Sequence, residues 1–222
     1  VRSLPARREL VMRFGPEGGP ELFRLIIVWP VEPPRGPRLA IIIDDCGGRD
    51  PYRSGLLDLP VTPAVLPYRA YSRAVASAAR EAGREVMLHL PCEPLGRENP
   101  GPGALYTHMS DDELRRLVEK ALDDVGPVDG VNNHMGSKLT SDRRAVAAVM
   151  EVLHERRLFF VDSVTYHTTV AEGVAAEFGL AHAGRDIFLD NDPARRAVVR
   201  ELRRAVDLAR ERDGPVVAIG HD

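Results

Sequence analysis

The chain has 222 residues, of which 44% are hydrophobic, so it is long enough for one large domain with a buried core, and global disorder is excluded. Its 30 basic and 33 acidic residues are interspersed and give a formal net charge of −3, so the sequence offers no electrostatic footprint for nucleic acid. No apolar run approaches the roughly 20 residues of a transmembrane helix, and its two cysteines fit neither a disulfide framework nor a CxxC metal site.

The N-terminal segment has the pattern of a β-hairpin followed by a linker. Two β-rich runs, Glu9–Phe14 and Leu22–Trp29, flank a segment rich in glycine and proline, and four prolines then fall within Pro30–Pro37. We therefore expect a hairpin and linker over residues 1–37 and a separate domain over residues 38–222. The absence of an initiator methionine and of a signal peptide indicates a piece of a longer protein.

Beyond the linker, short apolar runs alternate with amphipathic helical patterns. The runs with the length and composition of buried strands are Leu39–Ile43, Thr62–Leu66, Glu85–Leu90, Val128–Asn133, Leu158–Val161, Asp186–Leu189 and Pro215–Ile219. This alternation predicts an α/β fold with about seven parallel strands, and burial of both sheet faces explains the continuous apolar runs. Periodicity alone does not choose between an open sheet and a closed barrel.

Two of the intervening helices have recognisable starts. Ser110 and Glu113 form a capping box, because the serine hydroxyl accepts from a first-turn amide while the glutamate reaches back to the serine amide. Asp192 and Pro193 are expected to be the N-cap and the first residue of another helix.

Polar residues directly follow almost every predicted strand. They are Asp44 and Asp45, His89, Asn132 with Asn133 and His134, Asp162 with Ser163, Asp190 with Asn191, and His221. In parallel α/β folds the ligand site lies at the carboxyl ends of the strands. Every strong strand except Thr62–Leu66 therefore delivers a titratable group to the same rim.

The adjacent carboxylates Asp44 and Asp45 are the sharpest feature of this rim, because they repel each other unless a cation or a shared proton lies between them. The simpler interpretation is that one of them caps the following turn. His89, between leucines, is typical of a buried core histidine, whereas His134 lies in a polar cluster. A mixed set of aspartate and these two histidines suits Zn²⁺ or a similar first-row ion with open positions for water and substrate.

Several segments together resemble the divergent polysaccharide deacetylase family. They are Ile43–Asp45 with Gly47 and Gly48, His89–Pro94, Gly130–Thr140, Phe160–Ser163 with Thr165, Phe188–Asp190, and Ala218–His221. The match covers about Arg38 to the end and leaves out the hairpin. This resemblance implies a distorted (β/α) barrel in which a metal-activated water attacks an acetamide carbonyl.

The resemblance also implies roles for individual residues. Asp44 is placed as the general base, and Asp45 and His89 as metal ligands. The family's second metal histidine falls at Glu93, so we expect His134 to replace it, with Glu93 as the alternative. His221 is placed as the general acid.

The remaining candidates are expected to bind or orient substrate: Glu93, Asn132, Asn133, Asp162, Arg185 and Asp190. Arg185 is expected to steady Asp190 or an anionic sugar substituent. Because the chain stops at Asp222, where the family usually continues with proline, we expect a barrel that is shortened at its C-terminus.

These features predict a metal-dependent hydrolase that removes acetyl groups from an envelope polysaccharide or a related amide, with a carbohydrate as its partner and the periplasm or cell envelope as its location. The alternative is a non-catalytic carbohydrate-binding module with a degenerate site. A third hypothesis is a glycosidase that uses Asp44 and Asp162 as its carboxylate pair.

Overall fold

The computed structural model describes residues 7–14, 23–30 and 36–222. The chain divides into two compact units, one within residues 2–36 and the other over residues 37–222.

The first unit contains an antiparallel hairpin. Its strands are β1 (Arg7–Phe14) and β2 (Phe23–Pro30), with Phe14 opposite Phe23. The predicted hairpin is present, and its first strand begins two residues earlier than predicted. The predicted turn and residues 31–35 of the predicted linker lie outside the described residues.

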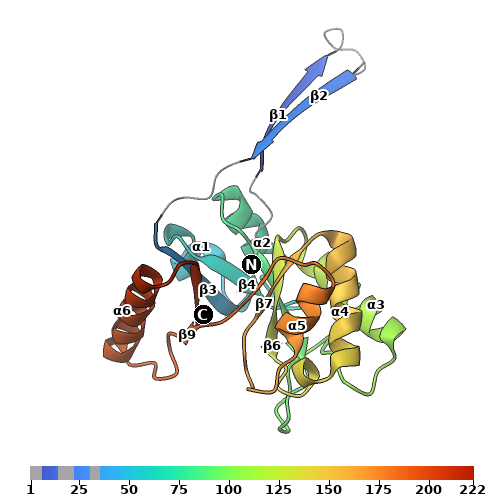
Figure 1. Ribbon diagram of the computed structural model, residues 1–222, viewed down its shortest axis with the longest axis vertical. Coiled ribbons are helices and arrows are strands. Elements are labelled where there is room, and N and C mark those ends of the chain that lie inside the picture. Colours follow the sequence, from blue (N-terminus) through green and yellow to red (C-terminus); the bar gives the residue numbers. More distant parts are fainter. Residues whose placement is uncertain (1–6, 15–22, 31–35) are drawn as a thin grey trace. The chain divides into compact units, whose positions relative to one another are not determined.

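The second unit is built on an eight-stranded sheet in the order β8-β7-β6-β5-β4-β3-β10-β9, in which every neighbouring pair is parallel (Figure 1). The strands are β3 (Arg38–Cys46), β4 (Thr62–Val65), β5 (Met87–Cys92), β6 (Gly130–Met135), β7 (Phe159–Asp162), β8 (His182–Gly184), β9 (Ile187–Phe188) and β10 (Pro215–His221). The predicted parallel α/β architecture is confirmed. The sequence prediction missed β8, because three residues ending in glycine leave no periodic signal.

The sheet curls into an incompletely closed barrel. β8 and β9 are its two edge strands, yet only Arg185 and Asp186 separate them in sequence. A connection of this length spans at most about 10 Å, so the two edges lie side by side. The amide of Arg185 donates to the carbonyl of Asp162 on β7, and the amide of Asp186 donates to the carbonyl of Val217 on β10, both at 2.9 Å. The chain itself thus bridges the gap, which confirms the predicted distorted barrel.

Helices cover the outside of the sheet. They are α1 (Pro51–Ser54), α2 (Ser72–Glu81), α3 (Asp111–Val125), α4 (Arg143–Arg156), α5 (Ala171–Glu177) and α6 (Arg195–Glu211), with 3-10 turns η1 (Leu56–Asp58) and η2 (Leu139–Ser141). Within the described part of the chain, no helix combines the length and the apolar character that crossing a bilayer requires.

The two predicted helix starts have different outcomes. Ser110 caps α3 as predicted: its Oγ accepts from the amide of Glu113 at 3.4 Å, and Oε2 of Glu113 accepts from the serine amide at 2.9 Å. The prediction that Asp192 caps the last helix is wrong. Oδ1 of Asp192 accepts from the amide of Ala194 at 3.0 Å and forms a turn ahead of the helix, so α6 begins only at Arg195.

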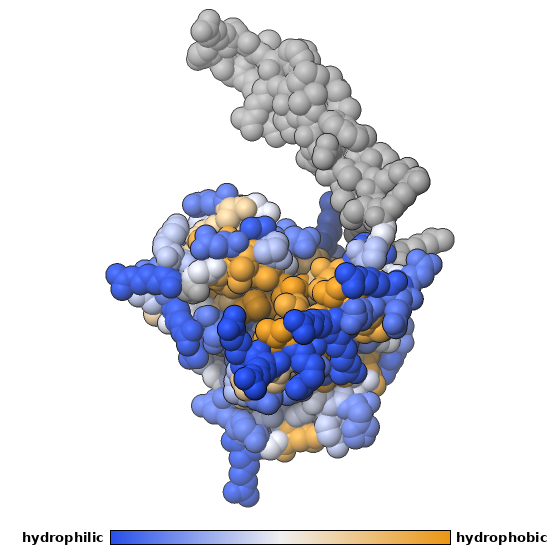
Figure 2. Space-filling model, turned by 90° about the vertical axis from the view of Figure 1, so that its left-hand side faces the viewer, coloured by the Kyte–Doolittle hydropathy of each residue, from blue (hydrophilic) through white to orange (hydrophobic). Residues whose placement is uncertain are grey.

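Two apolar layers hold the barrel together. Its interior cluster consists of Ile42, Ala64, Met87, Val161, Val217 and Ile219, and a larger cluster fills the space between the sheet and the helices. The residues on the other side of β3 (Leu39, Ile41 and Ile43) are only partly buried, and Leu39 and Ile41 pack against a small cluster to which α6 contributes. Figure 2 faces the side on which α1 and α6 lie, and it shows apolar residues in a hollow bordered by hydrophilic ones.

Candidate metal centre

Asp44 and Asp45 lie at the end of β3, and both face His89 of β5. In a regular strand, adjacent side chains point to opposite faces. Asp45, however, has a φ of +60°, and the β3–β4 register shifts between Ile43 and Cys46. As a result, Nε2 of His89 lies 3.6 Å from Oδ2 of Asp44 and 3.3 Å from Oδ1 of Asp45. Such a conformation costs about 1–3 kcal/mol at a non-glycine residue and is typical of functional sites.

The alternation of side chains along β6 separates its polar cluster into two groups. Asn132 and His134 point to the same face of the sheet, and Asn132 is in register with His89 on the neighbouring strand β5. Asn133 points the other way, and its Oδ1 accepts from the amide of Ser163 at 2.9 Å. Asn133 therefore supports the backbone of the rim, whereas Asn132 and His134 reach the aspartates.

A buried chain of hydrogen bonds fixes where the proton of His89 lies. Nδ2 of Asn132 donates to Oδ1 of Asp44 at 2.7 Å, so Oδ1 of Asn132 is turned toward Nδ1 of His89, at 2.8 Å. An amide oxygen can only accept, so Nδ1 of His89 carries the hydrogen. When His89 is neutral, its Nε2 presents a lone pair to Asp45 and His134.

Three electron-pair donors converge at this point. The distances are 3.0 Å from Oδ1 of Asp45 to Nδ1 of His134, 3.1 Å between Nδ1 of His134 and Nε2 of His89, and 3.3 Å from Nε2 back to Asp45. Oδ1 of Asp45 is buried and accepts no hydrogen bond of good geometry from the described residues. Tetrahedral Zn²⁺ with bonds of about 2.0–2.1 Å separates its ligand atoms by about 3.3 Å. The three predicted ligands are thus brought together, and this group could hold a divalent ion.

The surroundings move the pKa values of the acidic pair in opposite directions. Burial raises the pKa of Asp44, and the opposing effects of His89 and Asn132 are smaller. Burial acts on Asp45 as well, but the imidazoles of His134 and His89 outweigh it and hold the pKa of Asp45 well below the usual range of a carboxyl. Burial lowers the pKa of His89, but the two aspartates beside it raise it overall.

Glu93, the alternative ligand, is bound to other partners. Its Oε1 accepts from Nζ of Lys138 at 2.8 Å, and its Oε2 accepts from both the amide and the hydroxyl of Thr107 at 2.7 Å. These bonds tie the loop that follows β5 to the segment that follows β6. The structure therefore places Glu93 as a clamp beside the centre and not within the converging group.

Asp162, predicted to bind substrate or to pair with Asp44, is fully buried at the end of β7. Its Oδ1 accepts from the amide of Val164 at 2.8 Å, and its Oδ2 accepts from the hydroxyl of Thr169 at 2.6 Å. Val164 has a φ of +46°, which is strained for a β-branched residue. Both oxygens of Asp162 thus stabilise the loop after β7.

His221 ends β10 in register with Asp44. Its Nδ1 lies 3.0 and 3.1 Å from the two carboxylate oxygens of Asp190, which also accepts from the His221 amide at 2.8 Å. Phe188 stacks on the imidazole, and the guanidinium of Arg185 lies 3.6 Å from the centroid of the Phe188 ring. Arg185 also donates to the carbonyls of Ser163 and Val164 after β7, at 2.7 and 2.9 Å, and within the described part of the chain it makes no hydrogen bond to Asp190, which it was expected to steady.

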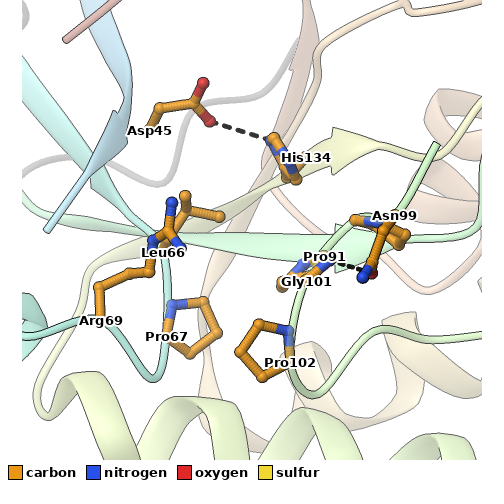
Figure 3. Close-up of a pocket in the computed structure, with 10 residues that line it drawn as sticks. Asp45, Leu66, Pro67, Arg69, Pro91, Asn99, Gly101, Pro102 and His134 are labelled. Carbon is orange, nitrogen blue, oxygen red and sulfur yellow. Dashed lines mark hydrogen bonds and ion pairs between the residues drawn. The ribbon is translucent and has the colours of Figure 1, made fainter. Parts of the chain in front are cut away.

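A cleft of about 160 Å³ opens beside Asp45 and His134 (Figure 3). One wall is formed by Leu66, Pro67 and Arg69 after β4, and the other by Pro91 of β5 and residues 99–102 of the loop that follows β5. None of these wall residues was predicted from the sequence as part of the site. The sequence feature that came closest to indicating this wall was the end of the predicted strand Thr62–Leu66, where no titratable residue follows directly.

The curled parallel barrel, with carboxylates and imidazoles gathered at one rim, defines a (β/α)-barrel protein with a candidate metal centre. A family model described as divergent polysaccharide deacetylase matches residues 41–222, and the chain belongs to this family.

The chain is 39% identical over 186 residues to the uncharacterized protein YibQ of Escherichia coli K12, and 34% identical over 186 residues to an uncharacterized protein of Haemophilus influenzae. Each match covers 83% of this chain but only 58% and 66% of the relatives, so the chain spans less than two thirds of their length. A crystal structure of an uncharacterized protein from Agrobacterium tumefaciens C58 has the same fold, with a TM-score of 0.80 at 24% identity, over 86% of this chain and 80% of that one.

Proposed function

We propose that the domain is a metal-dependent hydrolase that removes acetyl groups from an envelope polysaccharide or a related amide. The convergence of Asp45, His89 and His134 on one point carries this proposal. A mixed carboxylate and imidazole set favours Zn²⁺ among the common ions. Membership of a polysaccharide deacetylase family supports a carbohydrate substrate and an envelope or periplasmic location.

In this proposal Asp45, His89 and His134 hold the ion, and Asp44 is the base. When bound, the ion polarises the scissile carbonyl and lowers the pKa of water at the site. Asp44 is only 2% exposed, and the burial that raises its pKa makes it a better proton acceptor near neutral pH. Nδ2 of Asn132 donates to Asp44 and to Oγ of Ser163, and Oδ1 of Asn132 accepts from His89, so Asn132 is a positioning residue and not an oxyanion donor.

His221 acts as the acid that protonates the departing amine. Asp190 accepts from Nδ1 of His221, which leaves Nε2 turned away from Asp190 and available to the substrate. Because His221 and Asp44 are register partners on neighbouring parallel strands, the acid and the base face the same rim.

The test combines metal stoichiometry with acetate release from an N-acetylglucosamine tetramer. Wild type should bind one divalent ion per chain and release acetate, and His134→Ala should lose both properties. His154→Ala, which removes an exposed histidine on α4, should leave both unchanged. Failure of wild type to bind any divalent ion would overturn the proposal. Metal binding without acetate release would favour a non-catalytic carbohydrate-binding module.

A further inference from the structure

The cleft beside the candidate metal centre contains a single permanently cationic side chain. Among the described residues that line it, only Asp45, His134 and Arg69 are titratable. Figure 3 shows Arg69 on the same side of the cleft as Leu66 and Pro67, and Asp45 pointing toward His134. The carboxylate of Asp45 therefore interacts with the imidazoles of His134 and His89, and the positive charge of Arg69 borders the space that a substrate would enter.

The guanidinium of Arg69 has no ion-pair or hydrogen-bond partner within the described ranges of the chain. Arg73, one turn further along, uses Nη2 to donate to the carbonyl of Asp123 at 2.6 Å. An exposed arginine without a partner is common on protein surfaces. Arg69 differs from that ordinary case because it lines a cleft together with two candidate metal ligands.

The backbone that carries Arg69 is fixed. Its amide donates to Oγ of Ser72 at 2.9 Å, and this hydroxyl donates to the carbonyl of Leu66 at 2.6 Å. The amide of Tyr68 donates to Oδ2 of Asp124 on α3 at 2.7 Å. An arginine on a fixed segment loses little backbone freedom when it binds an anion, which favours selective recognition.

The cleft volume limits where that anion lies. About 160 Å³ is smaller than the roughly 300–1,000 Å³ of pockets that enclose drug-sized ligands. A single sugar-sized group is therefore enclosed, and an anion that reaches Arg69 lies on the sugar that carries the acetamide or on its direct neighbour.

We infer that Arg69 is a specificity-determining residue that selects N-acetylated saccharides bearing an acidic group, a carboxylate or a phosphate, beside the cleaved amide. This inference rests on the proposed function and names the substrate class of the same cleft. A guanidinium pairs with either anion through parallel N–H donors.

The kinetic test uses three matched probes: an N-acetylglucosamine tetramer, its 6-O-carboxymethyl form and its 6-O-phospho form. We expect wild type to prefer at least one acidic probe, and the two acidic arms identify the anion. Arg69→Gln should reduce kcat/KM for the preferred acidic probe roughly 10- to 100-fold more than for the neutral probe, which is the cost of one charge-assisted hydrogen bond. Arg73→Gln removes the same charge outside the cleft and should keep the wild-type ratio.

A binding titration on the metal-free protein separates the two possible failures. The role of Arg69 is overturned if an active wild type has equal kcat/KM on all three probes, or if Arg69→Gln keeps the preference for an acidic probe. Either result leaves the proposed function intact. If wild type hydrolyses no probe, the proposed function fails and binding decides the inference. Tighter binding of an acidic probe that Arg69→Gln abolishes would support it, and equal or absent binding would overturn it.

Discussion

Replacing Asn132 with alanine should weaken metal binding and destabilise the fold at the same time. The substitution removes the acceptor for Nδ1 of His89 and the donor to Oδ1 of Asp44, at 2.8 and 2.7 Å. Both partners are only 2% exposed, so each is left unpaired in the interior at about 1–3 kcal/mol. The free energy of unfolding of the metal-free protein should therefore fall by about 2–6 kcal/mol.

The effect of this substitution on metal affinity has a separate cause. Without Asn132, neither the ring orientation nor the tautomer of His89 is fixed, and losing such a partner of a ligand typically costs about 10- to 100-fold in affinity. Competition with a chromophoric chelator measures this change, and urea unfolding measures the stability. Asn132→Asp restores the acceptor for His89 but not the donor to Asp44, so it should recover metal affinity more than it recovers stability.

Thr169→Val is the matched control, because it removes the partly buried 2.6 Å hydrogen bond that Thr169 donates to Asp162 at the rim. It also removes the longer contacts of the same hydroxyl with the Ala171 amide, at 3.2 Å, and the Thr140 carbonyl, at 3.4 Å, and none of these groups belongs to the candidate metal centre. It should lower stability by about 1–3 kcal/mol and leave metal affinity unchanged. The reasoning is refuted if Asn132→Ala binds metal as tightly as wild type, or if Thr169→Val weakens binding to the same extent.

Two further outcomes follow from the charges around the centre. Burial raises the pKa of Glu93, but the hydrogen bonds from Lys138 and Thr107 have the larger combined effect, so the pKa of Glu93 is lowered on folding. The stability that these hydrogen bonds contribute is therefore present at neutral pH and is lost as the pH falls through the folded-state pKa of Glu93. Glu93→Gln should thus cost about 1 kcal/mol in urea unfolding at neutral pH and less at about pH 3, and loss of metal binding in this variant would instead identify Glu93 as a ligand. Burial lowers the pKa of His89, but Asp44 and Asp45 raise it overall, so a metal ion that binds Nε2 must displace a proton from His89. The metal affinity should therefore rise with pH and level off above the pKa of His89. Calorimetry in two buffers of different ionisation enthalpy detects the released proton, and a pH-independent affinity would contradict this account.

The location of the site was predictable from the sequence, because the ends of parallel strands share one edge of a sheet and side chains alternate along each strand. These two rules place Asn132 and His134 on one face beside His89. The same rules, applied to Asp44 and Asp45, predict opposite faces. The left-handed backbone of Asp45 overrides them, and no residue-type pattern indicates a left-handed aspartate.

Other features could not be predicted because they depend on contacts between distant segments. Asp162 has the position of a site residue, yet hydrogen bonds to Val164 and Thr169 use both of its oxygens. Arg69 lies three residues beyond the end of its predicted strand, so a search for polar residues that directly end a strand passes over it. Only the folded loop brings it to the cleft.

One backbone irregularity gives the two adjacent aspartates different environments, and the proposed function assigns them two chemical roles. Asp44 stays in register with His221 of β10 and is enclosed, so burial raises its pKa and favours proton transfer. Asp45 adopts the left-handed conformation and turns toward His89 and His134, which outweigh the effect of burial, hold its pKa low and keep the carboxylate charged. Neighbouring titratable groups whose pKa values are driven apart are typical of sites that need both a proton acceptor and a fixed charge. Under the proposed function, the strain at Asp45 is what allows a single strand end to supply both the base and a metal ligand.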